Sequence, residues 1–160
     1  MTLFFKNLLF TILVPGTFAL LLPILITAGR SPASGYIRAV AVILISFGVA
    51  IYVRCIWDFL IYGRGTPLPL DAPKGLVIRG IYLYIRNPMY SGVLMVILGW
   101  SIFFQDAVLV VYTVIIGTIF HLFVVLYEEP HLQQTFGDEY KNYCKQVGRW
   151  LPKIRRKRNA

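Results

Sequence analysis

The sequence predicts an all-α protein, a polytopic bundle of about four transmembrane helices. Of its 160 residues, 58% are hydrophobic and 14% are charged, and the mean hydropathy is +0.68. Soluble domains contain about 45–50% apolar residues, so this chain is too apolar to bury its hydrophobic side chains in one soluble core. Four apolar stretches approach the roughly 20 residues that cross a bilayer. We therefore expect residues 1–160 to form a single membrane domain.

The first two apolar stretches occupy residues 1–62. The first span is expected over residues 8–27, where two prolines should kink it. The second is expected over residues 36–62 and carries Arg54 and Asp58 near its C-terminal end. Their i, i+4 spacing favours a local ion pair over a role in a site.

The other two spans are expected over residues 88–104 and 107–127. Only Gln105 and Asp106 separate them, so they should form a tight antiparallel hairpin. Residues 63–87 are rich in glycine and proline, which indicates a loop between spans two and three.

Beyond the fourth span, residues 128–160 should form a C-terminal amphipathic helix and a basic tail. Apolar and aromatic side chains recur there at helical spacing, which predicts a helix with an aromatic face that packs on the loop or lies along the membrane surface. These side chains are Leu132, Phe136, Tyr140, Tyr143 and Val147.

The positive charges predict how the protein lies in the membrane. The net charge is +9, and half of the 16 Lys and Arg residues lie from Lys141 onward. A basic tail after the last span is typical of a topology signal and a contact with anionic lipid headgroups, so we do not expect nucleic acid as a partner. With an even number of spans, only Arg30 and Arg38 lie on the opposite side. The integral, multi-pass protein should therefore have its termini and long loop in the cytoplasm.

Polar residues that could carry chemistry gather at the two ends of the predicted hairpin. Arg86, Asn87 and Pro88 begin the third span, with Asn87 as a candidate N-cap and Pro88 at the first helical position. Glu128 and Glu129 directly follow the fourth span, where they favour a cation or begin the next helix. A hairpin brings both groups to the cytoplasmic interface, which predicts a pocket for a ligand with a carboxylate and a cationic centre. Neither cysteine has metal-ligand spacing, so we expect no metal.

Two linked patterns cover residues 65–152, about half of the chain. The first is Leu76-Val77-x-x-Gly80-x-Tyr82-x-x-x-Arg86-Asn87-Pro88-x-Tyr90-x-Gly92. The second is Glu128-Glu129-x-x-Leu132-x-x-x-Phe136-Gly137-x-x-Tyr140-x-x-Tyr143-x-x-x-Val147-x-Arg149-x-x-Pro152. Their order and spacing resemble the isoprenylcysteine carboxyl methyltransferase family and the related phospholipid N-methyltransferases.

The resemblance implies an integral-membrane methyltransferase that uses S-adenosylmethionine and modifies a membrane lipid or a lipidated acceptor. By position, the cofactor site would be lined by Val77, Tyr82, Asn87, Pro88 and Tyr90 and completed by Glu128 and Glu129. Arg86, Glu128 and Glu129 are the catalytic candidates, and either glutamate could act as a general base for an amine acceptor.

The chain also departs from the family pattern. Asn87 and Lys74 stand where the family commonly has His, and residues 123–127 lack an Arg that many members carry. Asn87 donates and accepts hydrogen bonds but does not titrate near neutral pH. We expect these changes to affect the choice of acceptor more than cofactor binding.

Two other functions fit parts of the sequence. A membrane reductase of the sterol-reductase type has a similar Arg-x-Pro-x-Tyr pattern and uses NADPH, but such proteins have many more spans. A non-enzymatic membrane protein could bind lipid headgroups through its loop and basic tail. The acceptor, the choice between O- and N-methylation and the oligomeric state stay open.

Overall fold

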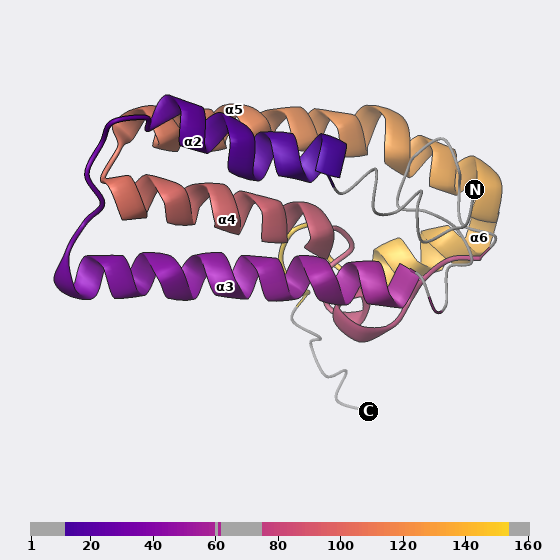
Figure 1. The fold of residues 1–160 in the computed structure, drawn as a ribbon. Helices are drawn as coiled ribbons and strands as arrows, with labels where there is room; N and C mark the ends of the chain where they lie inside the picture. The colour runs from indigo at the N-terminus through magenta and orange to yellow at the C-terminus, as the bar shows by residue number, and fades with distance from the viewer. Residues whose placement is uncertain (1–11, 60, 62–74, 154–160) are drawn as a thin grey trace.

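A computed structural model describes residues 12–59, 61 and 75–153 (Figure 1). The described chain is helical, and its only bridge between extended residues joins Ile85 and Gly148. The elements are a π-helix η1 (Ile12–Leu21), α2 (Leu22–Ile26), α3 (Gly35–Asp58), a 3-10 turn η3 (Gly80–Leu83), α4 (Pro88–Phe104), α5 (Ala107–Phe123), a π segment η4 (Val124–Glu128) and α6 (Glu129–Gln146).

The long helices lie side by side, with α4 between α3 and the pair formed by α2 and α5 (Figure 1). Two helices are long and apolar enough to cross a membrane, namely α3 and the continuous helix Ala107–Gln146. The helices over residues 15–26 and 88–104 are apolar but shorter. The all-helical prediction is confirmed for the described residues, whereas the number of spans stays a prediction.

Small residues bring α3 and α4 into close contact. A Cβ atom added to Gly48 would lie 2.6 Å from the Gly92 carbonyl oxygen, and one added to Gly92 would lie 2.8 Å from the Gly48 carbonyl oxygen. Two turns further along α4, Gly99 packs against Ile45 and the Ala41 carbonyl. Between membrane helices, where lipid is as apolar as the side chains, such close backbone contact is a main source of association.

The N-terminal helix is held to α4 and α5 by hydrogen bonds to its backbone. Trp100 Nε1 donates to the Ala19 carbonyl at 3.0 Å, and the Tyr112 hydroxyl donates to the Phe18 carbonyl at 2.9 Å. Both carbonyls belong to η1, whose π winding contains Pro15. The predicted first span begins at residue 8 and therefore lies partly outside the described residues.

The helices α4 and α5 run in opposite directions and are joined by Gln105 and Asp106 (Figure 1). Gln105 has a left-handed conformation with φ 51°, which ends α4. Asp106 caps α5 by accepting a hydrogen bond from Val108 N at 2.7 Å. The bounds of α4 coincide with the predicted stretch 88–104. The helix α3 ends at Asp58, Phe59 and Ile61 continue in π winding, and the predicted end at residue 62 lies outside the described residues.

We expect Asp106→Ala to lower the free energy of unfolding by about 2 kcal/mol. Asp106 is 3% exposed, caps α5 and forms an ion pair with Arg30, so the substitution removes both interactions. Asp106→Asn keeps a cap acceptor and should lose less. Thermal unfolding in detergent, followed by circular dichroism, measures both variants. Equal losses would contradict a capping role.

The C-terminal helix bends at Gly137, within the predicted amphipathic helix. Pro130 lies in the first turn of α6, which continues from α5 through η4 without a break. This agrees with the alternative in which the glutamates begin the next helix. The helix breaks instead at Gly137, whose φ of 53° and ψ of −123° are not helical. The chain therefore turns back about two turns later, towards the start of α4 (Figure 1).

The predicted aromatic face of α6 packs on the loop rather than lying free on a membrane surface. Tyr140, Tyr143 and Val147 are buried in one cluster with Leu76 and Ile78. Leu132 and Phe136 pack against the same cluster. The described part of the loop is thereby held against α6.

Candidate functional site

A charged cluster forms where α4 begins and α5 gives way to α6. Arg86 Nη1 lies 3.1 Å from Glu129 Oε1, and the Arg149 guanidinium donates to both Glu129 oxygens at 2.7 and 2.8 Å. The side chains of Arg86 and Glu129 are 10% and 17% exposed, which shields them from most water. The predicted proximity of Arg86 and Glu129 is therefore present in the structure.

Two short extended segments hold this cluster in place. Arg86 N donates to the Gly148 carbonyl at 2.8 Å, and Asn87 Nδ2 donates to the Arg149 carbonyl at 3.2 Å. Asn87 lies at the N-cap position of α4, as predicted, but its side chain makes no cap hydrogen bond. Because that amide is committed to Arg149, Asn87 links α4 to the C-terminal segment. Pro88 occupies the start of α4, as predicted.

Glu128 has different surroundings from its neighbour. The Tyr90 hydroxyl donates to Glu128 Oε2 at 2.8 Å. The Tyr90 ring packs against Phe120 and Trp150, with centroids 4.9 and 6.5 Å away. The Glu128 carboxylate is therefore bonded to a tyrosine that belongs to an aromatic cluster, and no arginine forms an ion pair with Glu128 among the described residues.

The pKa values of the two adjacent carboxyl groups, Glu128 and Glu129, are shifted in opposite directions. Both follow the apolar part of the helix, which ends at Tyr127. Burial raises the pKa of Glu128 above 4.5; the charge of Glu129 adds to this rise, and the Tyr90 hydrogen bond opposes it. Burial acts in the same direction on Glu129, but the hydrogen bonds from Arg149 and the charge of Arg86 outweigh it and lower the pKa of Glu129. Glu129 is therefore held as an anion, whereas Glu128 takes up a proton more easily.

We expect the contribution of Glu129 to stability to depend on pH. Its folded-state pKa lies below 4.5, so this contribution is present above pH 4.5 and is lost as the pH falls through the folded-state value. The difference in melting temperature between the wild type and Glu129→Gln should be largest near neutral pH and should shrink below about pH 4. A difference that stays constant down to about pH 3 would contradict the ion-pair role.

Val77 and Tyr82 are buried beside the end of α3, in one cluster with Cys55 and Met89. The Tyr143 hydroxyl donates to the Tyr82 carbonyl at 2.7 Å and connects this segment to α6. Burial raises the pKa of Tyr82 well above its usual value, and the nearby charge of Glu128 contributes. The predicted site residues therefore form two neighbouring groups, one around Tyr82 and one around Glu128.

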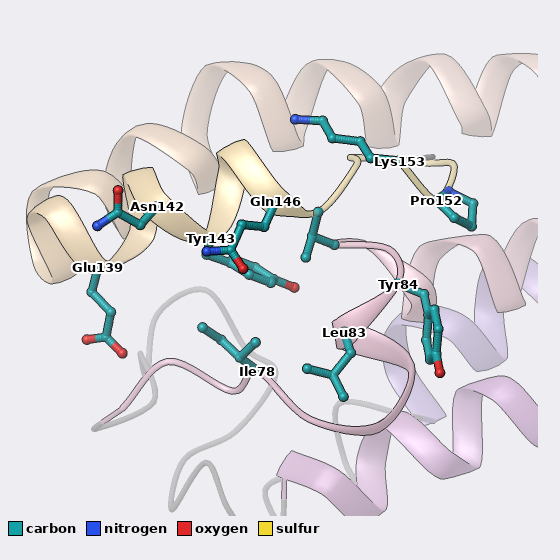
Figure 2. A pocket seen from close by; sticks show the side chains of 10 residues that line it. Ile78, Leu83, Tyr84, Glu139, Asn142, Tyr143, Gln146, Pro152 and Lys153 are labelled. Atoms are coloured by element: carbon teal, nitrogen blue, oxygen red, sulfur yellow. The ribbon is translucent and has the colours of Figure 1, made fainter. Parts of the chain in front are cut away.

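A pocket of about 640 Å³ opens between the η3 segment and α6 (Figure 2). Its volume falls in the range of roughly 300–1,000 Å³ typical of ligand sites. None of the predicted site residues lines it. The lining residues are Ile78, Leu83, Tyr84, Glu139, Asn142, Tyr143, Gln146, Val147, Pro152 and Lys153.

Arg149 is the main site residue that sequence reasoning missed. It appeared in the second motif, but 20 residues separate it from Glu129, and no local spacing predicts that contact. Cys144 also belongs to the cluster, because Arg86 Nη1 lies 2.5 Å from its Sγ atom. Trp150 donates from Nε1 to His121 Nδ1 at 3.1 Å and so holds the C-terminal segment against α5.

Known proteins match part of the chain, including the start of α4 and the two glutamates that precede α6 or begin it. A family profile described as phospholipid methyltransferase matches residues 36–139. An uncharacterized protein of Haemophilus influenzae is 32% identical over 63 residues, which are 39% of this chain and 100% of that protein. Methanethiol S-methyltransferase of Pseudomonas deceptionensis is 37% identical over 76 residues, 48% of this chain and 28% of that enzyme.

Protein-S-isoprenylcysteine O-methyltransferase B of Arabidopsis thaliana is 30% identical over 77 residues, 48% of this chain and 39% of that enzyme. The matched region thus spans less than half the length of either named enzyme. Together with the apolar helices and the charged cluster at their ends, these likenesses define a membrane protein of the methyltransferase class. The chain belongs to the phospholipid methyltransferase family.

Proposed function

We propose that the protein transfers a methyl group from S-adenosylmethionine to a membrane-resident acceptor, either a prenylcysteine-like carboxylate or a lipid amine. The observation that carries the proposal is the Glu128 carboxyl group, which is partly buried, bonded to Tyr90 and adjacent to the Arg86–Glu129–Arg149 cluster. Family membership and the printed activities of the two enzymes above support methyl transfer as the reaction.

The residues present fit such a donor. S-adenosylmethionine, when bound, supplies a methyl group on a positively charged sulfur. A partly buried carboxylate beside aromatic rings suits a cationic ligand, and Glu128 with Tyr90 and Phe120 provides this combination. Val77, Tyr82, Asn87 and Pro88 complete the set that we propose holds it. Because the Asn87 amide is bonded to the Arg149 carbonyl, the role that we propose for Asn87 is to fix the backbone at the start of α4.

The two glutamates have separate roles in this proposal. Methyl transfer is an in-line displacement, so the contribution of the chain is mainly orientation. Glu129 keeps Arg86 and Arg149 in place and, with its lowered pKa, is a poor proton acceptor. Glu128 has a raised pKa and can take the proton that an amine acceptor must lose. A carboxylate acceptor is already ionised and needs no base.

The surroundings of the site are part of the same proposal. The acceptor would enter from the bilayer, while the termini and the loop face the cytoplasm. Anionic lipid headgroups would contact the basic residues at and after Lys153, most of which lie outside the described residues.

The test is calorimetric binding of S-adenosylmethionine and NADPH to detergent-purified protein. We expect the wild type to bind S-adenosylmethionine alone and Glu128→Gln to bind it at least about tenfold more weakly, because the counter-charge is lost. Asp138→Asn is the matched control, since Asp138 is an exposed carboxylate further along α6 that does not line the pocket. Binding of NADPH instead would favour the hypothesis of a membrane reductase. Binding of neither ligand by folded protein would overturn the proposal.

A further inference from the structure

The C-terminal end of α3 carries a carboxylate that the proposed reaction does not use. Asp58 is 0% exposed, and Arg54 Nη2 lies 3.1 Å from its Oδ1 atom. Neither Asp58 oxygen accepts a hydrogen bond within the described part of the chain. The Arg54 side chain is itself 51% exposed. Burying a carboxylate with one half-exposed partner is costly.

Gly80 lies directly against the Asp58 carboxylate. A Cβ atom added to Gly80 would stand 2.5 Å from Asp58 Oδ2 and 3.5 Å from Arg54 Nη2. Gly80 also has a φ of 54°, a conformation that other residues rarely adopt. Backbone conformation and space therefore both require glycine here, and the Arg54–Asp58 pair sets how close the turn comes to α3.

The turn at Gly80 connects α3 to the proposed donor site. Gly80 begins η3, and Tyr82 follows two residues later. The Tyr82 side chain packs in one buried cluster with Cys55. The Tyr82 carbonyl accepts the hydrogen bond from Tyr143 of α6. One face of α3 thus meets the loop through Asp58 and Cys55, one helical turn apart.

We propose that Asp58 is a positioning residue for the donor site. Its carboxylate, held by Arg54, fixes the turn at Gly80 and thereby sets Val77 and Tyr82 where the cofactor is to bind. This inference rests on the proposed function, because only there do Val77 and Tyr82 contact a ligand. The placement of residues 76–84 can nevertheless be measured without any ligand.

The experiment compares Asp58→Asn with Asp106→Asn in the full-length protein. Both substitutions remove the charge of a buried aspartate that pairs with an arginine. Asp58 lies at the end of α3, and Asp106 precedes α5. We expect Asp58→Asn to speed amide hydrogen exchange in residues 76–84 about tenfold and to weaken S-adenosylmethionine binding about tenfold. Asp106→Asn should lower the melting temperature and leave both values unchanged. Arg54→Lys keeps the positive charge next to Asp58, so its hydrogen exchange and its S-adenosylmethionine binding should match those of the wild type.

Unchanged exchange in residues 76–84 of folded Asp58→Asn would overturn the inference, as would equal weakening of binding by both aspartate variants. If Asp58→Asn does not fold, Gly80→Ala tests the same contact from the loop, and exchange there should again rise. If the wild type does not bind S-adenosylmethionine while Asp58→Asn still loosens residues 76–84, the proposed function fails and the placement of the loop by Asp58 stands.

Discussion

Gly148→Ala should abolish S-adenosylmethionine binding and lower the free energy of unfolding by about 3 kcal/mol or more. A Cβ atom on Gly148 would collide with the Leu151 carbonyl oxygen and lie 3.1 Å from the carbonyl carbon. Both are backbone atoms, so the turn must open. Arg149 follows directly and would be drawn away from Glu129, leaving Arg86 and Glu129 poorly compensated.

Gly75→Ala is the matched control for this substitution. A Cβ atom on Gly75 would meet no atom within 4 Å in the described structure. Calorimetric binding and thermal unfolding of both variants measure the difference. If Gly148→Ala melts and binds like Gly75→Ala, the C-terminal segment does not hold the cluster as described.

The second large effect is expected between the helices, where Gly92→Ala should lower the free energy of unfolding by about 2–3 kcal/mol. The new methyl group would lie 2.8 Å from the Gly48 carbonyl oxygen and 3.3 Å from the Tyr52 nitrogen. Neither backbone atom can yield without moving α3 away from α4. Unfolding by denaturant in a fixed detergent provides the measurement.

Gly117→Ala makes the same change on α5 and should raise, not lower, the free energy of unfolding. Its added methyl group would meet only the Leu94 methyl groups, at 3.7 Å, which is ordinary contact. Since glycine within a helix is unfavourable by roughly 0.5–1 kcal/mol relative to alanine, this variant should be slightly more stable than the wild type. Similar losses in both variants would show that close contact of α3 and α4 is not what requires Gly92.

Local signals in the sequence were enough to place α4. A proline stands at its first position, Asn87 precedes it, and the apolar run stops at Gln105, so its bounds coincide with those of the structure. The same holds for the proximity of Arg86 and Glu129, because two antiparallel helices joined by two residues bring the start of one beside the end of the other.

The bend in α6 and the difference between Glu128 and Glu129 could not be predicted from local sequence signals. Proline is tolerated in the first turn of a helix, so Pro130 does not interrupt α6, and the bend occurs at Gly137, where a positive φ is available. The sequence also left Glu128 and Glu129 equivalent. They differ because Arg149 binds one and Tyr90 the other, and neither pairing follows from a helical or strand repeat.

The pairing of residues 85–87 with 147–149 has a consequence for biosynthesis. The helices from η1 to α6 all precede Gly148 in the chain, so every apolar helix has been synthesised before Arg149 is added. Arg86 and Glu129 must wait for that last segment to complete their ion pairs. The cluster is therefore completed last, and we expect a chain that stops before residue 147 to form its helices without the ion pairs of Arg149.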